Sequence, residues 1–362
     1  MKTPSILDAR SLRTAPSLVI VAALFGASST AAARESEPKQ SASIAPVWAA
    51  VNVGADGSRV QQYASSPATI TTSGTNGTYS VVLNGAAFNV QGNVQVVATG
   101  TAATRCKVTL HSPNGRGHTI GVRCASADGT TIASSFTLVF QTRFVGGTGA
   151  YLRYDANAAA LNSSLSWASA GSNSVSKAAT GRYTATLGAL DPNSAVHVTA
   201  TGLNDSYCNV ESWSGTTVTV ACFGGNGQPT DSGFSLLATP QATRYAMIGG
   251  HARVEIVNGA WAAPAATSVV VGARPSVPGS LSVTGQTVSF ERTFSSVTWP
   301  LFSLVTAFGP AAGFCKVSSA QWVESSRAAV VTPSCFAANG SAIARPLVTS
   351  VATTAAPQEP PG

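Results

Sequence analysis

The residue types that most often perform acid–base chemistry are few in this chain. Its 362 residues include four histidines, His111, His118, His197 and His251. A catalytic histidine needs an acid or a nucleophile held beside it, and the only near pair along the chain is His197 with Asp205. This pair is typical of a solvent-facing strand histidine followed by a turn aspartate. No Gly-x-Ser-x-Gly or His-Glu-x-x-His motif occurs, so the usual signals of a hydrolase are missing.

No residue pattern indicates a cofactor or a metal, and we expect neither. Asp56-Gly57 and Asp128-Gly129 are turn sequences, whereas calcium takes about six to eight oxygens, usually from several carboxylates. The stretch FGGNGQP, Phe223 to Pro229, is rich in glycine but has no lysine for a phosphate and leads into a strand. Metal ligation by cysteine would require closely spaced pairs, and the chain has none.

The charge balance argues against a nucleic-acid partner. Only 10% of the residues are charged, against roughly 25% in an average protein. The net charge of +7 falls to +5 without the first 33 residues, and the arginines are scattered singly. A nucleic-acid surface usually shows a basic stripe with interleaved aromatic residues.

The start of the chain has the parts of a secretory signal peptide. Lys2, Arg10 and Arg13 precede the apolar run LVIVAALF, Leu18 to Phe25, and small residues end at Ala33. That run is well short of the ~20 residues that span a bilayer. We therefore expect a signal peptide over residues 1–33, a linker over 34–44, and a mature protein without a membrane span that is secreted or periplasmic.

The six cysteines belong to a pattern that occurs three times, about 100 residues apart. A Gly precedes the first Cys by six residues, and a Val follows that Cys by two: Gly100, Cys106 and Val108; Gly202, Cys208 and Val210; Gly309, Cys315 and Val317. The second cysteines, Cys124, Cys222 and Cys335, each have a Gly five residues later. This spacing predicts three modules, over residues 45–145, 146–248 and 249–350, the third degenerate, and a disordered tail over 351–362.

Each cysteine pair is centred on a predicted turn. The midpoints fall at Gly115, Gly215 and Ser325. Residues at equal distances from a hairpin turn face each other with Cα atoms ~4.5–5.5 Å apart, which is within disulfide range. An even number of cysteines in an exported chain also favours disulfides. We therefore predict three bonds within modules, Cys106–Cys124, Cys208–Cys222 and Cys315–Cys335.

Period-two alternation dominates each copy and predicts strands. In Val94 to Ala98, alternate apolar residues are expected to pack inward and the residues between them to face out. The second copy repeats this pattern, with His197 and Thr199 on the outward side. Six to eight short strands per copy, separated by turn signals, predict an all-β fold of three tandem antiparallel β-sandwich modules of immunoglobulin-like type.

The aromatic residues offer the best candidates for ligand contact. Trp213 and Trp322 lie between paired cysteines, near the predicted hairpin tips. An exposed indole presents a rigid apolar face that can stack on a sugar ring. The alternative is that both tryptophans pack in the core or at module joints, and His111 at the matching position of the first copy argues against one site repeated three times.

The assembled pattern resembles a group of secreted bacterial proteins built from tandem modules. The resemblance is carried by Gly77-Thr78-Tyr79, by GNVQVVATG from Gly92 to Gly100, by the Cys106 and Cys124 pair, and by Asp231-Ser232-Gly233-Phe234. It covers most of Val47 to Val348 and is weakest in the third copy, which lacks the Tyr and the Asp-Ser. The resemblance implies export and module limits, and it transfers no functional residue.

Together these features favour a secreted, non-catalytic repeat protein that binds or builds extracellular or cell-surface material, such as a polysaccharide or a cell envelope. The alternative is a secreted hydrolase with a site at a module joint. Self-association is a third hypothesis, because repeat modules with few surface charges can associate edge to edge.

The disulfide pairing is open to a direct test. Proteolysis of the unreduced protein should release three linked peptide pairs, which contain Cys106 with Cys124, Cys208 with Cys222, and Cys315 with Cys335. Mass spectrometry before and after reduction identifies them. A disulfide between cysteines of different copies would contradict the prediction.

Overall fold

The structure, a computed structural model, describes residues 47–143, 149–190, 193–239, 248–263, 268–270, 279–291 and 300–353. All of them belong to one of the two units into which the chain divides, Ala45–Gly362. The predicted signal peptide and linker, residues 1–33 and 34–44, lie outside the described residues. The predicted tail begins too early, because the last strand continues through Thr353.

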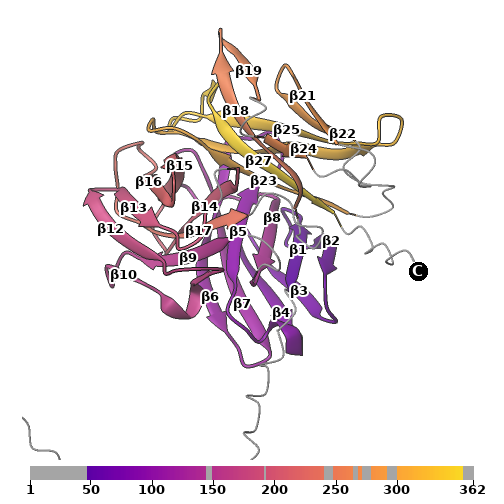
Figure 1. Ribbon diagram of the computed structural model, residues 1–362. Helices are drawn as coiled ribbons and strands as arrows, with labels where there is room; N and C mark the ends of the chain where they lie inside the picture. The colour runs from indigo at the N-terminus through magenta and orange to yellow at the C-terminus, as the bar shows by residue number, and fades with distance from the viewer. Residues whose placement is uncertain are drawn as a thin grey trace, which may run out of the picture. The chain divides into compact units, whose positions relative to one another are not determined.

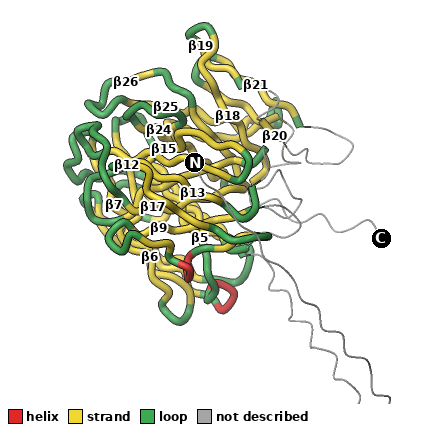
Figure 2. The backbone as a smooth tube through the Cα atoms, turned by 60° about the vertical axis from the view of Figure 1, so that its left-hand side comes forward, coloured by secondary structure: helices red, strands yellow, loops and turns green. Residues whose placement is uncertain are grey.

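The described chain is all-β, as predicted. Figure 2 shows strands joined by loops, with two short 3₁₀ turns, η1 (Ala86–Phe88) and η2 (Ser163–Leu165). The first sequence copy forms β1 (Trp48–Val53), β2 (Arg59–Ala64), β3 (Thr69–Thr75), β4 (Thr78–Asn84), β5 (Asn93–Ala98), β6 (Thr104–Pro113), β7 (Gly117–Ser126) and β8 (Phe136–Gln141). The second forms β9 (Ala150–Asp155), β10 (Ala160–Leu161), β11 (Trp167–Ala168), β12 (Ser174–Ala179), β13 (Arg182–Thr186), β14 (Ala195–Thr201), β15 (Tyr207–Ser214), β16 (Thr217–Phe223) and β17 (Gly233–Thr239). The third forms β18 (Ile248–Val257), β19 (Ala260–Ala262), β20 (Ser268–Val270), β21 (Ser280–Thr284), β22 (Thr287–Glu291), β23 (Leu301–Ala307), β24 (Phe314–Val323), β25 (Ala328–Phe336), β26 (Ala342–Ile343) and β27 (Leu347–Thr353).

Each sequence copy contributes two sets of antiparallel strands, and the strand order is the same in all three. The first set runs β2-β1-β8-β5, β10-β9-β17-β14 and β19-β18-β27-β23 in the successive copies. The second set runs β3-β4-β7-β6, β12-β13-β16-β15 and β21-β22-β25-β24. Apolar residues from both sets pack between them, as Val51 of β1 and Val122 of β7 do in the first copy.

The cysteine hairpins have the register that the midpoint argument predicts. Cys106 lies directly opposite Cys124, Cys208 opposite Cys222, and Cys315 opposite Cys335. Each pair forms a disulfide with a Cα–Cα distance of 4.0 Å. Gly215, at the tightest of these turns, has φ +55°, a conformation that glycine adopts without steric cost.

The centre of the fold differs from the expectation of one inward and one outward face. Every residue of β5, β14 and β23 is buried. These three strands contact one another and lie close together in Figure 1. The residues predicted to face out, such as Val97, His197 and Thr199, therefore pack against other copies of the repeat. The prediction of solvent-facing side chains on these strands is wrong.

The Gly-x-Tyr motif has a structural role in two copies. The hydroxyl of Tyr79 accepts a hydrogen bond from Ser134 N (3.1 Å), and the hydroxyl of Tyr183 accepts one from Ser232 N (3.1 Å). Both contacts fix the chain just before the last strand of the copy. The third copy has Val288 at the matching position after the turn, so it lacks the hydroxyl.

Removal of this hydroxyl should destabilise the protein. Tyr183→Phe leaves the buried Ser232 N–H without its acceptor, and we expect it to lower the free energy of unfolding by about 1–3 kcal/mol. Urea unfolding followed by tryptophan fluorescence measures the change. Tyr63→Phe, at a half-buried tyrosine whose ring packs on Trp48 (4.5 Å between centroids), is the control. Equal stability of Tyr183→Phe and the wild type would contradict the assigned role.

Candidate functional site

Three equivalent main-chain contacts join the sequence copies to one another. Each uses the repeated Gly as donor and the repeated Val as acceptor. Gly202 N donates to Val108 O (2.9 Å), Gly309 N to Val210 O (3.0 Å), and Gly100 N to Val317 O (2.9 Å). A one-residue parallel bridge accompanies each contact. The first copy thus contacts the second, the second the third, and the third the first; we call these contacts joints 1–2, 2–3 and 3–1.

A β-bulge shapes each acceptor strand. The register of the cysteine hairpin shifts directly after Val108, after Val210 and after Val317. A bulge bends an edge strand and interrupts its ladder. The equivalent position of the three bulges places the same carbonyl beside the neighbouring copy at each joint.

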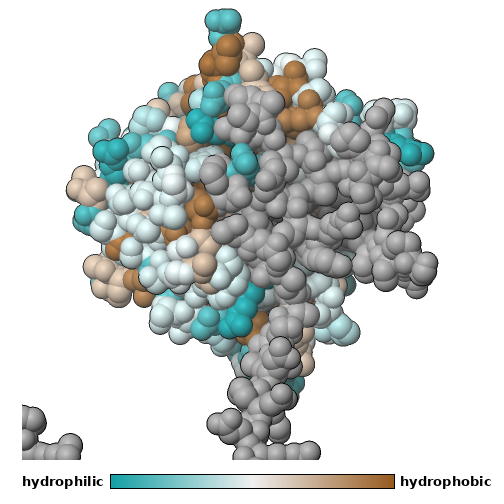
Figure 3. Space-filling model, viewed as in Figure 1, coloured by the Kyte–Doolittle hydropathy of each residue, from teal (hydrophilic) through white to brown (hydrophobic). Residues whose placement is uncertain are grey.

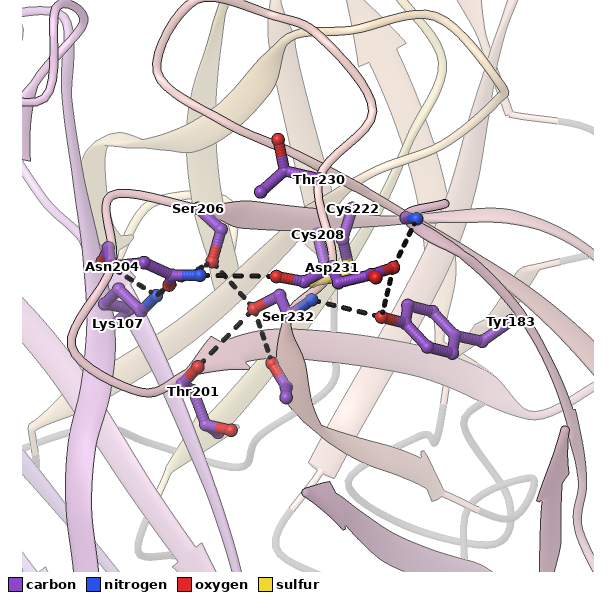
Figure 4. Close-up of a disulfide and its surroundings, with 12 residues drawn as sticks. Lys107, Tyr183, Thr201, Asn204, Ser206, Cys208, Cys222, Thr230, Asp231 and Ser232 are labelled. Atoms are coloured by element: carbon purple, nitrogen blue, oxygen red, sulfur yellow. Dashed lines mark hydrogen bonds between the residues drawn. A yellow bond between two sulfur atoms is a disulfide. The ribbon is translucent and has the colours of Figure 1, made fainter. Parts of the chain in front are cut away.

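Joint 1–2 buries a lysine. Lys107, directly after the first cysteine of its copy, is 7% exposed. Its Nζ donates to Asn204 O (3.0 Å), Asn204 Oδ1 (2.6 Å) and Ser206 Oγ (2.9 Å). Figure 4 shows this group beside the Cys208–Cys222 disulfide. The loop of the second copy thus supplies three oxygens to a cation of the first.

Joint 3–1 repeats this arrangement with the matching lysine. Lys316 is 1% exposed, and its Nζ donates to Ala102 O (2.6 Å) and Thr104 Oγ1 (2.8 Å) of the first copy. Thr104 stands where Ser206 stands in the second copy. Thr104 also contacts Ser134 (3.0 Å), as Ser206 contacts Ser232 (2.7 Å).

Joint 2–3 has no lysine at the corresponding position, and the buried cation near it donates within its own copy. The residue after the first cysteine is Asn209, whose Nδ2 donates to Ala311 O (3.1 Å). The third copy has Arg345 where the others have Ser134 and Ser232, and this guanidinium donates to Phe308 O (3.1 Å). Gly313 replaces the threonine or serine before the cysteine, and a Cβ there would lie 2.7 Å from Arg345 Nη1. The larger cation is thus accommodated by the smallest residue.

These three cations have no carboxylate as a hydrogen-bond partner in the described part of the chain; its ion pairs are Lys177–Asp231, Arg182–Glu211 and Arg253–Glu255. Burial is therefore the largest effect on the pKa of each, and nearby groups offset it at most in part. It lowers the pKa of Lys107 to about 7, with Arg123 adding to the effect, that of Lys316 to about 8 and that of Arg345 to about 10.

A cavity of about 60 Å³ lies where the three joints meet. Its lining consists of equivalent segments from the copies, residues 96–98, 198–200 and 305–307 together with 105–107, 207–209 and 314–315. The Arg105 guanidinium lies 5.1 Å from the ring centre of Tyr207 and 5.4 Å from that of Phe314. The volume suits about four waters and is far below the ~300–1,000 Å³ of small-molecule sites.

The histidines take part in packing contacts. His197 is 1% exposed, and its Nδ1 and Nε2 contact Thr306 Oγ1 (3.0 Å) and Ser350 Oγ (2.6 Å) of the third copy. Its neighbour in sequence, Asp205, instead accepts from Gly225 N (3.1 Å). The interpretation of His197 as solvent-facing is therefore wrong.

The remaining histidines are also engaged. His111 and His118 contact each other (3.1 Å), and His118 also contacts Val90 O (2.9 Å). His251 Nε2 lies 2.6 Å from Asn193 O. Burial lowers the pKa of His111 and His118. In the described chain no three His, Cys, Asp or Glu side chains gather as a metal site would require.

The two candidate tryptophans lie in different environments. Trp213 is half-buried, with its ring 5.3 Å from that of Phe308 at joint 2–3 and the Arg253 guanidinium 5.3 Å from its centre. Trp322 is half-buried near the tip of the β24–β25 hairpin, and its Nε1 donates to Glu324 Oε2 (2.6 Å). The structure does not bring the two residues together at one joint.

Sequence reasoning missed the joint cations Lys107, Lys316 and Arg345. A signal was present, because two of the three residues after the first cysteine are lysines. Comparison with protein-family models, curated proteins and solved structures finds no match to this chain. Among the residues that the structure describes, no helix has the length and apolar character to cross a membrane.

The buried His197 should make the protein sensitive to acid. Burial, with a smaller effect from His251, lowers its pKa from 6.5 to about 3. Between these values the unfolded chain binds a proton there that the folded chain does not, so the free energy of unfolding should decrease by about 1.4 kcal/mol for each unit by which the pH is lowered. His197→Gln, which introduces the residue of the first copy, should flatten this dependence in urea titrations at pH 7 and 4.5. An unchanged dependence would contradict the assignment.

Proposed function

We propose that this chain is an exported, non-catalytic protein of three β-sandwich modules that binds or builds extracellular or cell-surface material. One observation carries the proposal: the side chains best suited to chemistry hold the copies together. Lys107 and Lys316 bind oxygens of a neighbouring copy, and His197 bridges the second copy to the third. This use of reactive groups suits a rigid scaffold.

The cysteines support export. All six form disulfides, and such bonds persist in oxidising compartments outside the cytoplasm. They close loops of 14 to 20 residues, and small secreted domains commonly rely on such bonds for stability. The sequence features of a signal peptide point the same way.

Trp322 is the best-placed residue for ligand contact. It lies at the end of a long hairpin, with a carboxylate on its indole nitrogen. An indole beside a carboxylate combines an apolar face for a sugar ring with an acceptor for its hydroxyls. The described residues visible in Figure 3 are mostly of intermediate to hydrophilic character, with small, separate hydrophobic patches, so a polar ligand such as a glycan suits this face better than an apolar one.

The outer strands favour assembly as a second mode of action. In the described part, β3, β12 and β21 each pair with a single neighbour, β4, β13 and β22. All three are rich in Ser, Thr or small residues and largely exposed. Unpaired edges of this kind can add a strand from another molecule, which would build larger structures from one repeated contact.

A depletion assay tests the binding proposal. The mature chain is incubated with insoluble glycans and bacterial envelopes, and the protein left in solution is measured against concentration. We expect saturable loss to at least one material, and Trp322→Ala should weaken binding about tenfold, which corresponds to about 1.4 kcal/mol. Leu203→Ala, at a residue that is 79% exposed on the second copy, is the matched control and should bind as the wild type does.

Trp213→Ala is less informative, because that indole packs at joint 2–3.

Light scattering of the same preparation detects assembly. The proposal would be overturned if no material depletes the protein and the protein shows no concentration-dependent assembly. Turnover in a panel of ester, peptide and glycoside substrates would instead establish the hydrolase alternative.

A further inference from the structure

An amine, a hydroxyl and a carboxamide contact one another at joint 1–2. Lys107 Nζ lies 2.6 Å from Asn204 Oδ1 and 2.9 Å from Ser206 Oγ, and Ser206 Oγ donates to the same Oδ1 at 2.6 Å. Figure 4 shows Lys107 and Asn204 approaching from different strands and loops beside the disulfide. A hydrogen-bonded triangle of these groups contains the components of an amide-exchange reaction.

We propose that Lys107 and Asn204 form an isopeptide bond, which links the first and second copies covalently. Nζ forms a bond to Cγ of Asn204, and the bond from Cγ to Nδ2 breaks. The departing nitrogen takes the electron pair of that bond together with a proton from the amine, and it leaves as ammonia. No oxidant, reductant or cofactor is needed.

The environment favours the amine as a nucleophile. Only an unprotonated amine can attack a carbonyl carbon, and Lys107 is 7% exposed without a carboxylate on its Nζ. Burial lowers its pKa to about 7, so a large fraction is unprotonated at neutral pH. An ordinary surface lysine has a pKa of about 10.4 and is almost fully protonated there.

The carboxamide is held and polarised at the same place. Because a C=O bond is about 1.2 Å long, Cγ lies within about 4 Å of Nζ. Ser206, 1% exposed and backed by Ser232 (2.7 Å), donates to the oxygen on which negative charge develops during attack. Asn204 Nδ2 donates to Asp231 O (3.3 Å), which holds the leaving nitrogen on the far side, and Asn204 is exposed, so ammonia can depart to solvent.

The other joints lack one of these components. Lys316 contacts a main-chain carbonyl and a threonine hydroxyl, and neither is a carboxamide. Joint 2–3 has a carboxamide in Asn209, but its cation is the arginine Arg345. The geometry therefore assigns the bond to joint 1–2 alone, and Lys316 serves as an internal control.

Mass spectrometry of the purified full chain tests the bond. The reduced protein should be lighter by one ammonia than its sequence requires, and proteolysis should yield one branched peptide that joins Lys107 to Asn204. Lys107→Arg and Asn204→Ala should each restore the full mass, whereas Lys316→Arg should keep the deficit. Ser206→Ala should slow formation about 100-fold, measured as the linked fraction over time at fixed pH.

The result that would overturn the proposal is a wild-type chain of full mass that yields separate peptides for Lys107 and Asn204. Conversion of Asn204 to Asp without linkage would overturn it as well, because it raises the mass instead. Since the wild-type peptides decide the matter, the test does not depend on how well any variant folds. It is also independent of the depletion assay, so either proposal can fail without the other.

Discussion

A buried lysine without a carboxylate partner is stable only where protein oxygens replace the water that it loses. Lys107 meets this condition through three oxygens of the second copy, and Lys316 through two of the first. Neither copy can supply these oxygens to its own lysine. The burial of each of these lysines therefore depends on a neighbouring copy, in keeping with the single compact unit that Ala45–Gly362 forms. Joint 2–3 differs, because Arg345 donates to Phe308 O of its own copy, and Gly313 leaves room for its side chain.

The cyclic order of the joints explains why the central strands are buried on both sides. Each repeated Gly donates to the bulged strand of the preceding copy. The contact from Gly100 to Val317 joins the first copy to the third, so the three joints form a closed ring. In this closed ring of contacts, both faces of β5, β14 and β23 are covered by protein. Polar side chains on them must then find partners, as Thr199 does with Gln95 (2.8 Å) and His197 with Thr306. These buried hydrogen bonds make the relative placement of the copies specific, because a shifted copy would leave them unsatisfied.

The parts of this structure that were predictable are those set by short-range geometry. The hairpins and the facing cysteines follow from turn residues and equal spacing, both of which lie within about 20 residues of sequence. The all-β class follows from alternation in the same way. The environment of His197 was not predictable, because its partners lie 109 and 153 residues away in another copy. Alternation indicates that one face of a strand is more apolar than the other, but it does not predict what covers the more polar face. The joint lysines were visible as a repeated residue, yet a lysine in a strand is usually solvated.

The disulfides join strands within one copy, whereas the proposed isopeptide bond would join two copies. Each disulfide joins adjacent strands of one hairpin and leaves the joints unchanged. A bond from Lys107 to Asn204 would span 97 residues and would constrain the unfolded chain more than any of the disulfides, because the entropy of loop closure grows with loop length. The bond would also decide which joints can separate, because joint 1–2 could no longer open. Joint 3–1, whose partners Lys316 and Ala102 are 214 residues apart, would remain without a covalent link. Joint 2–3 would also remain without one, so the third copy could separate while the first two copies stay joined.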